Sequence, residues 1–228
     1  MHSLTEDLKK FARSLGADLV GVASVDRFAG APEGHRADDV LPQAKAVVVC
    51  AKRIPNGILE GPATSYQRTM DVMHIQLDQI ACQIAVFLER EGGLAVPVPA
   101  DEPYCHWEEG NLYGRGDLSH KHAAQAAGLG RLGKNAMLIT PEFGNRVQLV
   151  SVVTSVELAA DEMIQRELCL SGCSLCIDAC PAGAIGEGQQ VNQKLCRGVM
   201  NQKLPRGWVV ENCRECRKVC KVGVKRAG

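Results

Sequence analysis

The stretch CLSGCSLCIDACP, Cys169–Pro181, decides how this chain of 228 residues is organised. It holds four cysteines, and the last is followed directly by proline, as in bacterial proteins that carry two [4Fe–4S] clusters. Cys213, Cys216 and Cys220 form a second run, and Cys196 lies between the two runs. Eight of the 11 cysteines thus lie in the last quarter of the chain, and their spacing predicts two iron–sulfur clusters.

The eight cysteines divide into two groups of four thiolates. In two-cluster ferredoxins the cysteine before the proline ligates the other cluster, so the two runs exchange one ligand each. Zinc and disulfides are the alternatives, but zinc ribbons need neither the cysteine–proline ending nor a single cysteine midway, and disulfides need an oxidising compartment. The predicted ligands are Cys169, Cys173, Cys176 and Cys220 for one cluster, and Cys180, Cys196, Cys213 and Cys216 for the other.

Composition and charge restrict where the protein works. Hydrophobic residues make up 46% of the chain, yet no apolar stretch approaches the length of a membrane span. The first ten residues are polar and unlike a secretory signal, so we expect a cytoplasmic protein. Residues 201–228 hold eight Lys or Arg but two Glu, within a chain of zero net charge. This basic edge is expected to dock an acidic electron donor such as flavodoxin or ferredoxin; a nucleic acid, or plain solvation, are alternatives.

The rest of the chain is predicted to form a layered α/β domain over residues 1–160, followed by a ferredoxin-like domain over residues 161–228. Ser3 and Glu6 fit a capping box that starts a helix, which Gly16 ends. Apolar periodicity predicts further helices at 69–91 and 120–127. Residues 56–66 and 100–118 are predicted as loops. Strands are expected at 17–25, 44–51, 94–98, 136–140 and 147–156.

The segment AAGLGRLGKN, residues 126–135, followed by strands and then by the cysteine runs, resembles the epoxyqueuosine reductase family and the related reductive dehalogenases. The resemblance covers nearly the whole chain in order and layout. It implies a nitroreductase-like α/β domain that binds cobalamin and a bacterial-type two-[4Fe–4S] ferredoxin module that feeds it electrons. A Rossmann site is disfavoured because no strand ends just before the glycines. The implied cofactor contacts are Gly128, Gly130, Gly133, Lys134 and Asn135.

The chain departs from these families in three respects. Epoxyqueuosine reductases continue after the second cysteine run into a helical-repeat domain that grips tRNA, whereas this sequence ends eight residues after Cys220. We therefore expect a small-molecule substrate and no tRNA partner. The family's catalytic aspartate, counted back from the glycines, falls on Gly114, and Asp117 is the nearest aspartate. The twin-arginine signal of exported dehalogenases is absent.

Four residues before the glycine stretch are candidates for proton donation: His120, Asp117, Tyr104 and Tyr113. A neutral imidazole titrates near working pH, and a tyrosine beside a reduced metal centre can also supply a proton. The sequence thus predicts an oxidoreductase, suited to anaerobic metabolism, that passes electrons through two clusters to a corrinoid, which reduces a small organic substrate. An electron carrier without an organic cofactor and a flavin-dependent iron–sulfur reductase are the alternatives.

Overall fold

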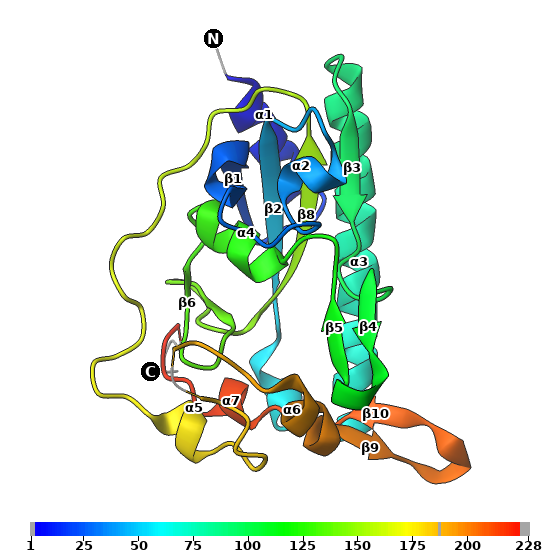
Figure 1. Ribbon diagram of the computed structural model, residues 1–228, viewed down its shortest axis with the longest axis vertical. Helices are drawn as coiled ribbons and strands as arrows, with labels where there is room; N and C mark the ends of the chain where they lie inside the picture. Colours follow the sequence, from blue (N-terminus) through cyan, green and yellow to red (C-terminus); the bar gives the residue numbers. More distant parts are fainter. Residues whose placement is uncertain (1–2, 187, 224–228) are drawn as a thin grey trace.

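A four-stranded antiparallel sheet lies at the centre of the molecule. The computed structural model describes residues 3–186 and 188–223 (Figure 1). The start of the first predicted domain and the end of the second therefore lie outside the described residues. The strands follow the order β1-β2-β8-β3, and every neighbouring pair is antiparallel. The prediction of a mixed α/β fold is confirmed. The strands are β1 (Leu19–Ser24), β2 (Ala46–Arg53), β8 (Val147–Thr154) and β3 (Ala95–Val98).

Helices cover both faces of this sheet. On one face lie α1 (Leu4–Ser14), capped by Ser3 as expected, and the long α3 (Ala63–Arg90). On the other face lies α4 (His120–Ala126). Successive strand residues point to opposite faces, so strand β2, whose first six residues are buried, sends Val48 and Cys50 towards α3, and Val47 and Val49 towards α4. Burial on both faces explains the continuous apolar run in β2.

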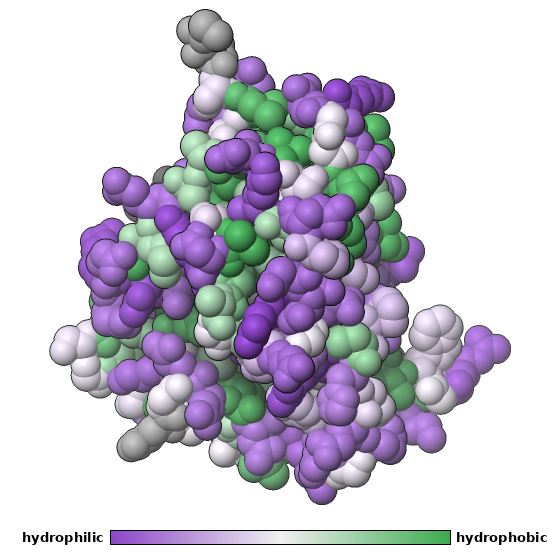
Figure 2. Space-filling view, turned by 45° about the horizontal axis from the view of Figure 1, so that its top comes forward, coloured by the Kyte–Doolittle hydropathy of each residue, from purple (hydrophilic) through white to green (hydrophobic). Residues whose placement is uncertain are grey.

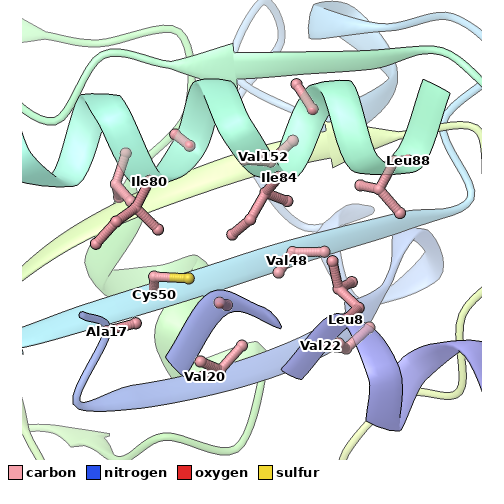
Figure 3. Packing of buried hydrophobic residues seen from close by; sticks show 14 of the residues in the cluster. Leu8, Ala17, Val20, Val22, Val48, Cys50, Ile80, Ile84, Leu88 and Val152 are labelled. Carbon is pink, nitrogen blue, oxygen red and sulfur yellow. The ribbon is translucent and has the colours of Figure 1, made fainter. Parts of the chain in front are cut away.

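Helix α3 packs against the sheet through a row of buried apolar residues. Figure 3 shows Ile80, Ile84 and Leu88 of α3 directed at the strand residues beneath them. Cys50 lies in this cluster, where burial raises the pKa of its thiol to about 12. It therefore behaves as a small buried hydrophobic residue.

Three predicted boundaries are wrong. Helix α3 begins at Ala63 instead of Thr69, because Pro62 precedes its first turn and the residues taken as loop continue the helix. The 100–118 segment is not wholly loop: it holds a polar hairpin, β4 (His106–Glu108) and β5 (Tyr113–Arg115), whose exposed residues lack the apolar alternation of a buried strand. The strand predicted at 136–140 is shorter, β7 (Leu138–Ile139). It pairs with β6 (Arg131–Leu132), which was not predicted, in a second short hairpin.

The cysteine-rich segment forms small elements beneath one end of the sheet (Figure 1). Its buried hydrophobic residues are Ala184, Ile185 and Val210, which make little core. On the face in Figure 2, hydrophobic residues are interspersed among hydrophilic ones. The segment contains α5 (Leu175–Asp178), α6 (Gln193–Met200), β9 (Asn201–Lys203), η4 (Pro205–Gly207), β10 (Val209–Glu211) and α7 (Glu215–Lys218). Short helices elsewhere are η1 (Val25–Phe28), α2 (Ala37–Val40), η2 (Asn56–Leu59) and η3 (Glu109–Asn111).

Across the described part of the chain, no helix combines the length and apolar character that crossing a bilayer requires.

The packing of α3 gives a testable prediction. Ile84 is fully buried against the sheet, whereas Ile75 on the same helix is 52% exposed. Ile84→Ala should lower the free energy of unfolding by about 2–5 kcal/mol, because it leaves a cavity in a close-packed core. Ile75→Ala should change it by less than about 1 kcal/mol. Urea denaturation followed by helical circular dichroism measures both, and equal losses would contradict the assigned helix face.

Candidate functional site

The eight cysteines of the C-terminal segment line two separate cavities. Cys169, Cys173, Cys176 and Cys220, the first thiol set, line a small one. Cys180, Cys196, Cys213 and Cys216, the second thiol set, line one end of a larger cavity of ≈ 400 Å³. In the described ranges, 3–186 and 188–223, no three His, Cys, Asp or Glu side chains are grouped as ligands of a single metal ion. The sets match the two groups expected from the sequence.

The electrostatic neighbours of the thiols follow the same division. Burial raises the pKa of Cys176, and so do the nearby thiols of the first set, Cys169, Cys173 and Cys220. Burial also raises the pKa of Cys196, with Cys213 and Cys180 adding to the effect. For Cys216, burial raises the pKa to about 11 against the opposing charge of Arg217. Thiols that disfavour each other's ionisation lie close together, as four ligands of one cluster must.

The segment between α4 and β8 holds both thiol sets in place. The Nζ atom of Lys134 donates to the carbonyl oxygen of Cys173 at 2.6 Å. The Nδ2 atom of Asn145 donates to the carbonyl oxygen of Cys216 at 3.0 Å. The guanidinium of Arg146, which is 6% exposed, donates to the carbonyl oxygen of Cys220 at 2.8 Å. Asn135 is buried and lines both thiol cavities, so it lies between the two sets.

Beyond the second thiol set, the large cavity opens into a cleft. Two smaller cavities, of ≈ 270 Å³ and ≈ 230 Å³, share lining residues with it. Ala100 lines all three, Lys121 and Gln148 line the first two, and His120 lines the smaller pair. The cleft, as we call these three cavities together, therefore runs from the cysteines along the start of α4 to the sheet.

A histidine–carboxylate pair lines the large cavity and was not found by sequence reasoning. The Nδ1 atom of His74, in α3, lies 3.2 Å from Oδ2 of Asp101. Burial lowers the pKa of His74, but the hydrogen bond and charge of Asp101 outweigh it, so the pKa is raised. The hydrogen bond from His74 in turn lowers the pKa of Asp101. Burial raises the pKa of nearby Glu211, on β10.

Three of the four predicted proton donors meet in the smallest cavity of the cleft. His120, Asp117 and Tyr104 line it together with Asp101. Tyr113 is placed differently, on β5, where its hydroxyl accepts a hydrogen bond from Nε of Arg115 at 2.7 Å. Asp117 lies close enough to the thiol of Cys105 to help raise its pKa, after the larger effect of burial. The Tyr104 hydroxyl accepts from Arg197 at 3.0 Å.

Both ring nitrogens of His120 have protein partners. Nε2 lies 2.8 Å from the carbonyl oxygen of Pro99 and must donate to it, because a carbonyl only accepts. Nδ1 lies 2.8 Å from the Ser151 hydroxyl. Burial lowers the pKa of His120, in spite of the Pro99 carbonyl. The geometry therefore describes a partly buried, neutral imidazole that fixes the start of α4.

The glycines of the 126–135 segment contact protein instead of facing the cleft. A Cβ at Gly128, whose φ is +73°, would lie 2.2 Å from the carbonyl oxygen of Glu162. One at Gly130 would lie 2.2 Å from that of Ile139, and one at Gly133 would meet the Ile139 side chain. These close approaches explain the glycines by the packing of the turn after α4. Lys134 and Asn135, by contrast, line the thiol cavities.

Gly114 is the position at which counting back from the glycines without gaps places the family's catalytic aspartate. Its backbone makes two hydrogen bonds with α6. Its N–H donates to Oε1 of Gln193 at 3.0 Å, and its carbonyl accepts from Nε2 at 3.2 Å. The Tyr104 ring packs against the same glycine. This position therefore joins the β4–β5 hairpin to the cysteine-rich segment.

Comparison with known proteins finds relatives along nearly the whole chain. Epoxyqueuosine reductase from Bacillus cereus is 26% identical over 96% of this chain and 64% of its own length. The enzyme from Bacillus subtilis is 25% identical over 89% and 56%. Tetrachloroethene reductive dehalogenase from Dehalobacter restrictus is 33% identical over 78% of this chain and 29% of its own length. The chain thus spans about three-fifths of the epoxyqueuosine reductases it matches. No protein-family model matches it.

Solved structures share the fold. Epoxyqueuosine reductase from Streptococcus thermophilus superposes with a TM-score of 0.70, at 18% identity, over 97% of this chain and 66% of its own. A catabolic reductive dehalogenase in complex with 3-bromo-4-hydroxybenzoic acid gives 0.72, at 20% identity, over 96% and 32%. Another reductive dehalogenase structure is described as suggesting a mechanism for B12-dependent dehalogenation; it gives 0.69 over 94% and 31%.

One of these structures corrects an expectation. An epoxyqueuosine reductase that covers 96% of this chain, at 24% identity and a TM-score of 0.69, was solved with an epoxyqueuosine-modified stem loop of tRNA-Tyr. We expected no tRNA partner because of where the sequence ends. That prediction is wrong, because a protein similar to this chain was solved with a tRNA stem loop. The resemblance itself is confirmed: over most of its length, this chain is related to the epoxyqueuosine reductases and the reductive dehalogenases.

Proposed function

We propose that this chain is a reductase whose C-terminal segment holds two [4Fe–4S] clusters beside a corrinoid bound in the cleft. The observation that carries the proposal is the division of eight thiols into two sets of four, each lining its own cavity. In this proposal residues 1–160 are the nitroreductase-like domain and residues 161–228 the ferredoxin module. When bound, the clusters would carry single electrons and the corrinoid would supply a low-potential metal centre.

The chain's own residues fit these groups by charge and position. A cluster bound by four thiolates is anionic overall, and Lys134 and Lys221 line the first thiol cavity, while Arg214 and Arg217 line the second. Asn135 borders both cavities and would keep two clusters adjacent. The cleft begins at the second thiol set, so that set would be the one nearest a corrinoid.

His74 and Asp101 are our proposed proton reserve for the cleft. Their raised and lowered pKa values favour a protonated imidazole beside a carboxylate on the wall of the large cavity. His120 is less suited, because a neutral ring with both nitrogens engaged holds its position and has no proton to release readily. Asp117 and Tyr104 line the adjoining cavity and remain proposed donors, whereas Tyr113 lies on the hairpin.

Metal and sulfide analysis tests the cluster assignment. Protein purified without air should contain about eight iron and about eight sulfide per chain. Cys176→Ala and Cys213→Ala, one from each thiol set, should each lose about half of the iron, because each removes one ligand of a different cluster. Cys82→Ala is the matched control, since Cys82 is exposed on α3 and belongs to neither set. Full iron in Cys176→Ala, or zinc in place of iron and sulfide, would disprove the proposal.

Added cofactors separate the corrinoid from its alternatives. After anaerobic incubation with hydroxocobalamin and gel filtration, corrinoid absorption should stay with the protein peak. Flavin retained instead would favour a flavin-dependent reductase, and retention of neither would favour an electron carrier.

The His74–Asp101 pair gives a pH-dependent prediction. The raised pKa of His74 means that its contribution to stability is complete below the unfolded pKa of about 6.5 and is lost as pH rises through the folded pKa. The lowered pKa of Asp101 keeps that carboxylate charged to a pH below its ordinary pKa of about 4. Glu211 and Arg197 are the other charged groups close to the pair.

His74→Gln should therefore lower Tm by about 2–4 °C at pH 5, as expected for a partly exposed pair worth about 1 kcal/mol, and by little at pH 8. His122→Gln is the control, because burial and Lys121 lower the pKa of His122 and its charge adds no stability at pH 5. A Tm difference for His74→Gln that is the same at both pH values would refute a charged pair.

A further inference from the structure

Arg146 is a buried cation to which the described residues offer no anion. Its side chain is 6% exposed. Its guanidinium donates to the carbonyl oxygen of Cys220 at 2.8 Å, and to those of Lys218 and Val222 at 3.4 Å each. Among residues 3–186 and 188–223, no carboxylate forms an ion pair with it. A buried charge without a counter-charge is strongly destabilising, so this position calls for an anion nearby.

Arg217 brings a second cation to the same place. Its guanidinium donates to the carbonyl oxygens of Asn145 and Val147, the residues on either side of Arg146. Within the described ranges, Arg217 has no carboxylate at ion-pair distance either. Because two like charges around one short stretch of backbone repel each other, the need for an adjacent anion increases.

A cluster held by the first thiol set would be that anion. Cys220 belongs to this set, and its carbonyl oxygen accepts directly from Arg146. The oxygen and the sulfur of one cysteine are at most about 5 Å apart, so the guanidinium lies within about 8 Å of a ligand sulfur. Four thiolates around a [4Fe–4S] core give a group of net negative charge, and that charge is one of the factors that set its reduction potential.

We propose that Arg146 is the internal counter-ion of the cluster held by the first thiol set and raises its reduction potential. Reduction adds one electron, and therefore one negative charge, to the cluster, and it requires no proton. A cation beside the cluster stabilises the reduced form more than the oxidised form, because the attraction grows with the charge. An arginine guanidinium keeps its proton, so this effect is permanent. The inference rests on the proposed clusters.

A redox titration of the anaerobically purified protein, followed by electron paramagnetic resonance, tests this inference without a substrate. The unaltered protein should show two one-electron reduction steps. Arg146→Gln keeps hydrogen-bond donors for the carbonyl oxygens but removes the charge. It should shift one step to a more negative potential by at least about 59 mV, which is a tenfold change in a one-electron equilibrium. Arg146→Lys keeps the charge and should leave both steps close to their original potentials.

Single-cluster variants identify the step that moves. In Cys213→Ala, which should retain the first cluster alone, adding Arg146→Gln should shift the remaining step. In Cys176→Ala, which should retain the second cluster alone, the same change should leave that step in place. Arg214→Gln is the matched control in the two-cluster protein. Arg214 is 7% exposed and also donates to backbone carbonyl oxygens, but it follows Cys213 of the second thiol set, so the first cluster's step should stay unchanged.

Unchanged potentials in Arg146→Gln, or equal shifts in Arg146→Gln and Arg146→Lys, would overturn the inference and leave the proposed function intact. Loss of the first cluster's iron from both variants would also overturn it, because the shape of the guanidinium and not its charge would then be required. Loss of that iron from Arg146→Gln alone would support it. Absence of iron and sulfide from the unaltered protein would remove both the inference and the proposed function.

Discussion

Hydrogen bonds from buried and half-buried side chains of the preceding part of the chain to backbone carbonyls of the cysteine-rich segment hold that segment in the fold. That segment has few buried hydrophobic residues of its own. Lys134, Asn145 and Arg146 instead hold the carbonyl oxygens beside the thiols, from one stretch of chain between α4 and β8. These contacts join residues that are about 40 to 75 positions apart in sequence. The positions of both thiol sets are thereby fixed relative to the sheet.

The same stretch of chain also explains the shape of the cleft. The turn after α4 can pass close to Glu162 and Ile139 only because it carries glycines, and this packing fixes the C-terminal end of α4. Lys121 and His120, at the start of the same helix, line the cleft, and His74 lines it from α3. The cleft is thus lined by residues of α3 and α4 and by the second thiol set, an arrangement suited to holding a ligand.

The sequence was most informative where spacing alone carries chemistry. The thiol sets follow from the cysteine runs, because four ligands on one small target permit few arrangements. The buried strands and helices α1, α3 and α4 followed from apolar periodicity. His74 was missed since it lies next to the apolar stripe of α3, between Met73 and Leu77, where a polar side chain is expected to face water. The glycines were assigned to a cofactor because the sequence does not show that Glu162 and Ile139 pack against them.

Arg197, which follows Cys196 of the second thiol set, contacts two aromatic side chains outside that set. The Arg197 guanidinium lies 5.2 Å from the ring centre of Tyr104 and 5.1 Å from that of Trp107, and these two rings stack. Trp107 belongs to the β4–β5 hairpin, and all three residues of its strand, β4, are exposed. If α6 holds a cluster through Cys196, as proposed, ordering of this helix would also restrain the indole ring of Trp107 through Arg197. The fluorescence of Trp107 would then report optically on assembly of that cluster.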